Sequence, residues 1–265
     1  MTTPKAPTRR SVAMALGSAP LLAAASARAA AALPGQSGAT GLAAAAYTAY
    51  KIEAQYALEP AGGGTQWTFD VPAMSNPPVR RRSELWWSID GRPVSYGSTG
   101  YVRYQADIGA DLGAAAFTSA DWAVLWQLLG TTYGVWKAPN FAITQANGQL
   151  RLTGGSGHPN HDPNAGRNYW WYRDLAPYAN WRSYRVRIES QLSTDPNVGW
   201  ISVWVNGVVV VDRWRPIARS GLRPGTFHPG QTTIYSRSGL YRGTNGTAAR
   251  PTYRQRSRHS AVVLS

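Results

Sequence analysis

The chain of 265 residues carries 27 Lys and Arg against 13 Asp and Glu, a net charge of +14, and 24 of its basic residues are arginines. It contains no cysteine, which excludes a disulfide framework and a thiolate metal site. Arginine binds carboxylate, sulfate and phosphate groups through two parallel hydrogen bonds, so the composition indicates an acidic partner, either a polyanionic polysaccharide or a nucleic acid. The 12 Trp and 14 Tyr residues either fill a β-sheet core or stack on sugar rings.

Residues 1–29 have the features of a twin-arginine export signal. Arg9 and Arg10 precede a short apolar run and a small-x-small cleavage site at Ala27-Arg28-Ala29. The run is too short and too rich in Ala, Gly and Ser to span a bilayer, so we expect a cleaved signal and no membrane anchor. We therefore expect a secreted, periplasmic or cell-envelope protein, with residues 30–46 as an Ala-, Gly- and Ser-rich linker.

The rest of the chain shows mainly strand patterns. The segment 47–58 is ambiguous, residues 109–120 predict a loop, and the basic tail after residue 250 shows no obvious strand. Strands are predicted where apolar and polar residues alternate or an apolar run is short: 67–71, 79–87, 100–108, 122–129, 168–175 and 184–192. Asn147-Gly148 and Asn206-Gly207 predict the turns of two hairpins.

These short strands, without a convincing long amphipathic helix, predict an all-β chain. The expected architecture is an antiparallel β-sandwich that forms a single domain over residues 47–258.

The segment 233–242 places polar and aromatic side chains on one face of a strand. Alternation gives that face the following residues: Tyr235, Arg237, Gly239 and Tyr241. Two phenols and a guanidinium make a poor core but suit the floor of a groove that binds an acidic sugar. The alternative is an exposed amphipathic edge strand.

Two earlier strands also carry polar residues at unexpected positions. Arg82 and Glu84 share a face of the strand 79–87, either as a structural ion pair or as part of a site. Gln127 is the one polar residue in an apolar strand. Because an amide is costly to bury without a partner, Gln127 either forms an internal hydrogen bond or points into a binding site.

Three motifs occur in a familiar order: Arg82-Ser83-Glu84-Leu85, then Trp126-Gln127, then Tyr235-x-Arg237-x-Gly239-x-Tyr241. Alginate lyases carry Arg-(Ser/Thr)-Glu-Leu, Gln-(Ile/Val)-His and Tyr-Phe-Lys-Ala-Gly-x-Tyr in the same order. The chain thus resembles the jelly-roll polysaccharide lyases, which include the alginate lyases, the glucuronan lyases and the heparin lyase I family, over most of residues 65–245. The resemblance implies a concanavalin-like β-jelly roll that binds its substrate across one sheet.

The resemblance also implies β-elimination at a uronic acid residue. In that reaction the carboxylate is neutralised, a base removes the proton from the adjacent carbon, and an acid protonates the departing oxygen. By resemblance Gln127 and Arg82 hold the carboxylate, and Tyr241 is base, acid or both. Arg237 replaces a lysine and keeps its charge beside the phenol, and Glu84 positions Arg82.

The chain departs from the family pattern at two positions, where Leu129 replaces a histidine and Trp86 replaces an arginine. Either the tyrosine works as both base and acid, or His158 or His161 in the loop 154–168 supplies an imidazole. These two histidines with Asp162 also make a candidate metal site, although their spacing fits no known motif. His228 is a further candidate base with less support.

We predict Tyr235, Arg103 and His158 as further substrate-binding residues. If one face of a sheet collects Arg82, Arg103, Arg185 or Arg187 with Arg237, these side chains form a cationic trough. The expected partner is an acidic polysaccharide, and we expect a monomer that binds no nucleic acid. We predict no cofactor and leave a structural calcium ion open.

Two other functions compete with a lyase. A lectin-like module that binds acidic polysaccharide without cleaving it is compatible with the missing histidine. A hydrolase on a similar fold needs paired carboxylates across a cleft, and no close Glu-x-Asp-x-Glu array is present. Nucleic-acid binding would explain the charge, but neither the aromatic–arginine strand nor the export signal. The sequence does not identify the sugar.

Overall fold

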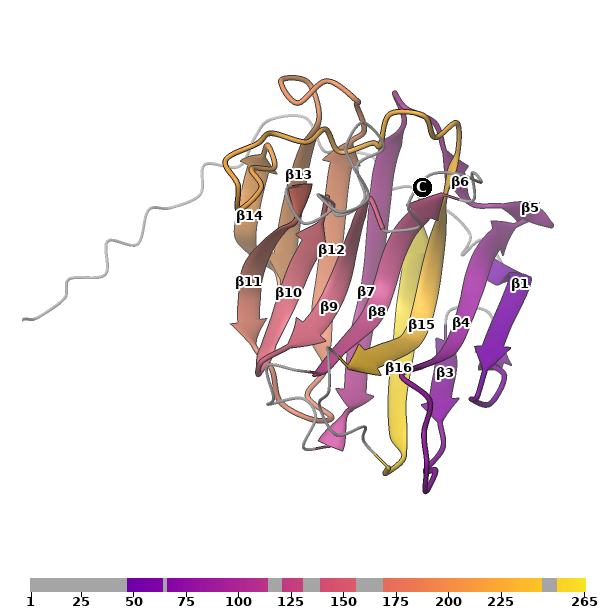
Figure 1. Ribbon diagram of the computed structural model, residues 1–265. Helices are drawn as coiled ribbons and strands as arrows, with labels where there is room; N and C mark the ends of the chain where they lie inside the picture. Colours follow the sequence, from indigo (N-terminus) through magenta and orange to yellow (C-terminus); the bar gives the residue numbers. More distant parts are fainter. Residues whose placement is uncertain (1–46, 64–65, 114–120, 131–138, 156–168, 245–251) are drawn as a thin grey trace, which may run out of the picture. The chain divides into compact units, whose positions relative to one another are not determined.

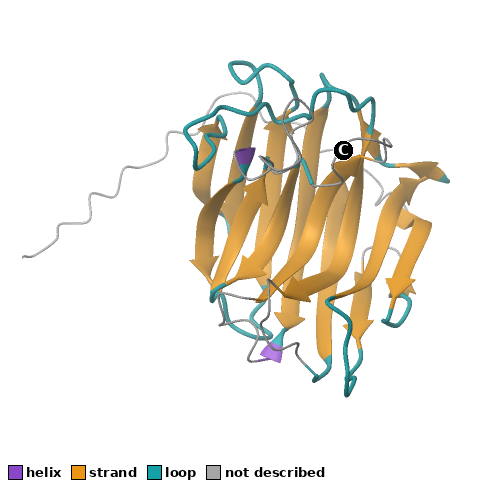
Figure 2. Cartoon of the chain, in the orientation of Figure 1, coloured by secondary structure: helices purple, strands orange, loops and turns teal. Residues whose placement is uncertain are grey.

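Two antiparallel β-sheets lie face to face in a sandwich (Figures 1 and 2). The computed structural model describes residues 47–63, 66–113, 121–130, 139–155, 169–244 and 252–265. The expected export signal and linker lie outside these described residues. The prediction of an all-β antiparallel sandwich is confirmed.

Within the described residues, one sheet has nine strands. Its main path runs β1 (Tyr47–Gln55), β4 (Arg80–Ile89), β15 (Ile234–Thr244), β8 (Asp121–Gly130), β9 (Phe141–Ala146), β10 (Gln149–Gly154) and β11 (Trp171–Pro177). Two short strands lie off this path: β5 (Arg92–Pro93) pairs with β4, and β6 (Ser95–Tyr96) pairs with β15.

The other sheet has seven strands in the part of the chain that the structure describes. Its order is β14 (Val208–Trp214), β13 (Trp200–Val205), β12 (Tyr184–Gln191), β7 (Tyr101–Asp111), β16 (Gln255–Leu264), β3 (Gln66–Val71) and β2 (Ala61–Gly63). A membrane-spanning helix is not found in the part of the chain that the structure describes.

The core between the sheets is built by the predicted alternation. On β7 the inward set is fully or almost fully buried: Val102, Tyr104, Ala106 and Ile108. Both predicted hairpins are present, and their Asn-Gly turns have the positive φ angles of 51° and 69° at Asn147 and Gly148, and of 52° and 82° at Asn206 and Gly207. Positive φ at both turn residues matches the right-handed twist of the paired strands.

The tail after residue 250 corrects the sequence prediction. It forms β16, which lies between β7 and β3, so the sheet extends beyond residue 258 to Leu264. Three of its inward positions hold Gln255, Ser257 and His259, all buried. Because these residues are polar, the strand lacks the apolar periodicity that sequence analysis detects, and only its pairing on both sides makes it a central strand.

His259 gives the fold a predictable acid sensitivity. It is fully buried, its ring packs edge-to-face on Phe69 at 5.0 Å, and its Nδ1 lies 3.4 Å from the hydroxyl of Tyr104. Burial lowers the pKa of His259 from 6.5 to about 3. The unfolded chain therefore takes up a proton that the folded chain does not, and this destabilises the fold progressively as the pH falls from 6.5 toward 3.

In the parent, the free energy of unfolding falls as the pH is lowered. We expect His259→Gln to make this fall less steep, by up to about 1.4 kcal/mol per pH unit. Urea unfolding at several pH values between roughly 7 and 4 measures how the free energy of unfolding changes with pH. Ser260→Ala, at the next position of the same strand, is the control and should keep the parent slope. An unchanged slope in His259→Gln would refute a buried neutral histidine.

Candidate active site on the nine-stranded sheet

The three motif strands lie side by side, with β15 between β4 and β8 (Figure 1). Their register brings the motif residues together: Arg237 pairs with Trp86 on one side and with Gln127 on the other, Gly239 pairs with Glu84, and Tyr241 pairs with Arg82. We call these residues with Lys51 and Glu53 of β1 the central cluster. It lies on the outward face of the nine-stranded sheet.

The two faces of β15 are used as the alternation predicts. On the inward face, Ser236 and Ser238 are buried and accept hydrogen bonds from the indole nitrogens of Trp126 and Trp87, at 2.9 Å and 2.8 Å. These bonds satisfy both hydroxyl and indole groups within the core. The arginine and the two tyrosines of the motif are thereby held on the outward face.

A hydrogen bond between Glu84 and Gln127 crosses β15. The Gln127 Nε2 donates to the Glu84 Oε1 at 2.6 Å, although β4 and β8 are not neighbours in the sheet. The bond passes over Gly239, where a Cβ atom would lie 2.7 Å from both the Cα and the Cγ of Glu84. The glycine of the motif is thus required by the close approach of Glu84.

The structure decides between the two alternatives for Gln127, an internal hydrogen bond or a side chain that points into a binding site. It is 2% exposed, and its amide nitrogen is engaged inside the protein by Glu84. This geometry favours a positioning contact behind the surface over a direct contact with a polymer.

Arg82 contacts two carboxylate side chains and the Tyr241 ring. Its Nη1 donates to the Glu53 Oε2 at 2.6 Å and lies 3.7 Å from the Glu84 Oε2. Its guanidinium carbon lies 4.3 Å from the centre of the Tyr241 ring. The half-buried Tyr241 ring also packs edge-to-face against Trp122 at 5.2 Å. The cation beside the phenol is therefore Arg82, whereas the sequence had suggested Arg237.

Arg237 is almost buried and packs on Trp86. Its guanidinium carbon lies 3.8 Å from the centre of the indole ring, and the Lys51 Nζ lies 4.8 Å from the same ring. Tyr235 packs against Trp86 at 5.0 Å between ring centres. Trp86, which replaces the family arginine, thus serves as an aromatic platform for two cations.

Lys51 and Glu53 were missed because the segment 47–58 looked ambiguous. A bulge in β1 between Ala49 and Lys51 shifts the pairing with β4, so Ala49 pairs with the core residue Trp87 while Glu53 pairs with Glu84 on the outward face. A bulge breaks the period-2 pattern, and this is the feature that hid the strand from sequence analysis.

Burial and charge act against each other at these groups. Burial raises the pKa of Glu84 despite the nearby cations Arg82 and Arg237. Burial also raises the pKa of Glu53, but Arg237 and the hydrogen bond from Arg82 outweigh it, so the pKa of Glu53 lies below its usual range. Burial disfavours the charge on Arg237 and lowers its pKa. Glu53 is therefore the carboxylate whose charge the cluster favours, and it lies among three cationic side chains: Lys51, Arg82 and Arg237.

Comparison with solved structures identifies the architecture. The endo-β-1,4-glucuronan lyase of the fungus Trichoderma reesei matches with a TM-score of 0.52 and 15% sequence identity, over 83% of this chain and 87% of that chain. An alginate lyase of Corynebacterium sp. matches with a TM-score of 0.47 and 15% identity, over 76% of this chain and 77% of that chain. An alginate lyase of Pseudomonas aeruginosa matches with a TM-score of 0.45 and 19% identity, over 75% of this chain and 82% of that chain. No family model and no curated protein sequence matches the chain.

The chain has the jelly-roll fold of a polysaccharide lyase. At 15% identity the likeness to the glucuronan lyase establishes the fold alone.

His228, the histidine candidate that lies within the described residues, is not part of the central cluster. His228 is 1% exposed in the segment before β15, so a polymer cannot reach it in this conformation. His158 and His161 lie outside the described residues. Leu129, at the family histidine position, is buried and pairs with Tyr235. Among the described residues, the phenol of Tyr241 is the group of the central cluster best suited to transfer a proton at a polymer.

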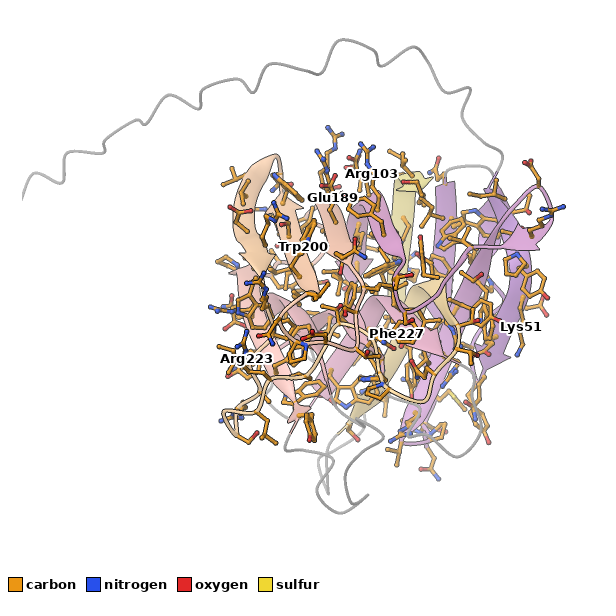
Figure 3. The ribbon with its side chains drawn as sticks, turned by 90° about the horizontal axis from the view of Figure 1, so that it is seen from above. Lys51, Arg103, Glu189, Trp200, Arg223 and Phe227 are labelled. Carbon is orange, nitrogen blue, oxygen red and sulfur yellow. The ribbon has the colours of Figure 1, made fainter. Side chains whose placement is uncertain are left out.

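Arg103 is not brought to the central cluster. It lies on β7, on the outward face of the seven-stranded sheet, where its Nε is 3.9 Å from the Glu189 Oε1. Figure 3 shows Arg103 and Glu189 together on that sheet, whereas Lys51 lies on the other. The side chains of β7 alternate as expected, but β7 pairs with β12 and β16 and so belongs to the seven-stranded sheet. Arg103 is therefore kept away from the central cluster by the strand order.

Arg185 and Arg187 lie on the same outward face of the seven-stranded sheet, and both are paired with carboxylates. Arg187 forms an ion pair with Glu189. Arg185 donates to both carboxylate oxygens of Asp107, at 2.8 Å and 3.1 Å. The cationic trough proposed from the sequence is therefore divided between two sheets.

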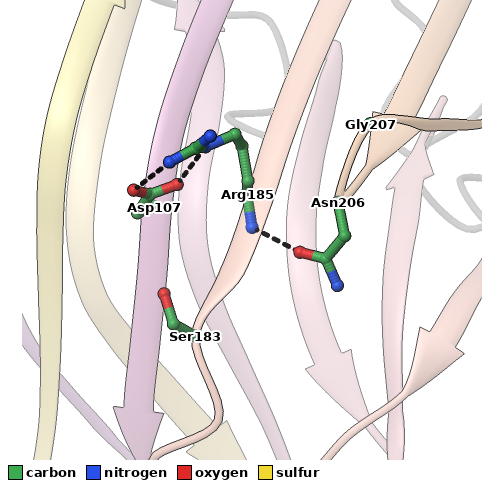
Figure 4. Close-up of a pocket in the computed structure, with 5 residues that line it drawn as sticks. All are labelled: Asp107, Ser183, Arg185, Asn206 and Gly207. Atoms are coloured by element: carbon green, nitrogen blue, oxygen red, sulfur yellow. Dashed lines mark hydrogen bonds and ion pairs between the residues drawn. The ribbon is translucent and has the colours of Figure 1, made fainter.

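A pocket on the seven-stranded sheet is shown in Figure 4. It is lined by Asp107, Ser183, Arg185, Asn206 and Gly207. The Asp107–Arg185 pair joins β7 to β12, and the hydrogen bond from the backbone nitrogen of Arg185 to the Asn206 Oδ1, at 2.9 Å, holds the β13–β14 hairpin against β12. These polar groups are engaged structurally, and the pocket is not part of the central cluster.

Within the described residues, no three His, Asp or Glu side chains lie close enough together to hold a metal ion.

Proposed function

We propose that the chain is an exported polysaccharide lyase that cleaves a uronic-acid polymer by β-elimination. The observation that carries this proposal is the placement of Tyr241, a half-buried phenol, in contact with the Arg82 guanidinium on the outward face of a lyase-type sheet. The glucuronan lyase with this fold supports a uronic-acid polymer as the substrate class. Export rests on the twin-arginine pattern of residues 1–29.

Arg82 and Arg237 have the charge needed to bind a uronate carboxylate. Binding and neutralising that carboxylate makes the proton on the adjacent carbon easier to remove, because negative charge develops on the carboxyl group in the transition state. Glu84 and Gln127 act behind the surface, where their hydrogen bond holds both side chains in place. They are therefore positioning residues in this proposal.

Tyr241 is the proposed base and acid. As a phenolate it takes the proton from the carbon, and the resulting phenol then donates that proton to the departing glycosidic oxygen. One residue can perform both steps when the proton and the leaving group lie on the same side of the sugar. The Arg82 guanidinium carbon lies 4.3 Å from the centre of this ring.

A panel of glucuronan, alginate, hyaluronan and heparin tests the proposal. We expect ultraviolet absorbance to rise with at least one unsulfated polymer, because β-elimination leaves a conjugated double bond in the product. A matched digestion with Tyr241→Phe controls for contaminating lyases. No absorbance rise with any polymer would contradict the lyase function.

A polysaccharide-binding module without catalysis is the second candidate. The observation that favours it is Leu129, which stands where the family has a histidine. Such a module would retain affinity for an acidic polymer that weakens with salt, and would show no absorbance rise.

A further inference from the structure

The edge strand β1 brings a carboxylate to the two arginines of the central cluster. The Glu53 Oε2 lies 2.6 Å from the Arg82 Nη1 and 3.8 Å from the Arg237 Nη1, and the Glu53 Oε1 lies 3.3 Å from the Lys51 Nζ. The β1 bulge between Ala49 and Lys51 places this carboxylate on the outward face. A single side chain thus bridges three cations.

These arginines are also the groups that the proposed function assigns to the substrate carboxylate. The Arg237 side chain is only 4% exposed, while those of Arg82 and Glu53 are 24% and 19% exposed. Arg237 packs on Trp86, and one of its terminal nitrogens faces Glu53. An incoming uronate that is to bind both arginines must therefore take the position that Glu53 now holds.

The neighbouring carboxylate cannot play the same part. Glu84 is fully buried, and its Oε1 accepts the hydrogen bond from Gln127. It lies 3.7 Å from Arg82 and is fixed between strands. Glu53 differs because it lies on an edge strand, is partly exposed, and has a second partner in the exposed Lys51, toward which it can turn.

We propose that Glu53 is the specificity-determining residue of the site: it occupies the carboxylate position between Arg82 and Arg237, and a substrate uronate displaces it. This inference rests on the proposed function. The displaced carboxylate stays on β1 beside the bound sugar, where it repels a second anionic group on the same residue. The preferred substrate class is therefore an unsulfated uronic-acid polymer, with one negative charge per acidic sugar, and sulfated polymers are disfavoured.

Binding measurements in the Tyr241→Phe background test this without turnover. Titration calorimetry at one fixed ionic strength compares a glucuronan oligosaccharide with a heparin oligosaccharide of equal length. We expect Glu53→Gln to bind the glucuronan oligosaccharide about tenfold more tightly, because the internal competitor loses its charge. Its affinity for the heparin oligosaccharide should rise more, so that the preference for the unsulfated polymer narrows.

Two further variants make the test specific. Glu53→Ala removes the amide oxygen that Glu53→Gln could still offer to Arg82, and it should show the same gain. Asp174→Asn is the matched control, because it removes one negative charge from the Arg151–Asp174 pair at the far edge of the same sheet. Its affinities should equal those of the parent, and thermal unfolding should show that all variants remain folded.

The outcomes separate this inference from the proposed function. If the parent binds glucuronan and neither Glu53 variant binds more tightly, Glu53 is not a competitor, and the lyase proposal is unaffected. An equal gain in Asp174→Asn would show a general charge effect and overturn the inference. If neither the parent nor the variants bind either oligosaccharide, the inference about Glu53 is wrong, and the absorbance panel decides the lyase proposal separately.

Discussion

Tyr241→Phe is expected to abolish β-elimination without disturbing the fold. Arg82 and Trp122 contact the Tyr241 ring, and phenylalanine retains that ring. The variant loses only the hydroxyl that carries the proton. General acid–base groups contribute roughly 10²- to 10⁴-fold to a rate, so we expect a fall in kcat of at least about 100-fold, measured by ultraviolet absorbance on the best polymer of the panel. Because both proton transfers are assigned to this hydroxyl, the fall should lie near the upper end.

Tyr235→Phe is the control for this prediction. Tyr235 lies on the same strand and face, where its ring packs on Trp86. It has no assigned proton transfer, so its variant should keep kcat within a few-fold of the parent, on the order of the changes seen for groups outside the chemistry. Equal losses in the two variants would contradict Tyr241 as the proton-transferring group. Unchanged affinity of Tyr241→Phe for the polymer would separate a loss of chemistry from a loss of binding.

Gly239→Ala is expected to damage both the fold and the site. The new methyl group would lie 2.7 Å from the Glu84 Cα and Cγ, and would also press against the carbonyl oxygen of Ser83. Backbone atoms of β4 cannot move without weakening its pairing with β15. Overpacking of this kind costs typically about 1–3 kcal/mol, which would appear as a lower midpoint of urea unfolding. Displacement of Glu84 would also break its hydrogen bond to Gln127, so activity should fall further than stability alone explains.

A glycine in open space provides the control. At Gly63, on β2, an added Cβ would meet no atom within 4 Å, so Gly63→Ala should keep stability and activity. A second comparison is Glu84→Gln, which keeps the side-chain length and allows a hydrogen bond with Gln127. If Gly239→Ala were as stable and active as Gly63→Ala, the close passage of Glu84 over β15 would be refuted.

The strand pattern and the order of the motifs were readable from the sequence because both are local properties. Alternation on β15 separates Tyr241 and Arg237 from the buried serines, since successive side chains of a strand point to opposite faces. The Asn-Gly turns were equally local, because their positive φ angles depend on the two turn residues themselves. These features suffice to predict the class of fold and the face on which Tyr241 lies, whereas its catalytic role was predicted from the resemblance to the jelly-roll lyases.

Contacts between side chains of different strands could not be predicted from local sequence patterns. Glu53 lies on an irregular edge strand, and the bulge that aims it at Arg82 depends on pairing with β4. Arg103 has the same local pattern as a site residue but belongs to the other sheet. β16 has polar inward residues, and its central place comes from its two neighbours. In each case, residues distant in the sequence decide the outcome.

By itself the sequence determined an all-β chain with a basic, arginine-rich character, and it put an arginine, a glycine and two tyrosines on one face of a strand. Only the tertiary structure decided which cation lies over Tyr241, that Gln127 binds Glu84 across Gly239, and that Glu53 stands between the arginines. The physical reason is that side-chain direction follows from the backbone of one strand, whereas hydrogen bonds and ion pairs between strands depend on sheet order and register.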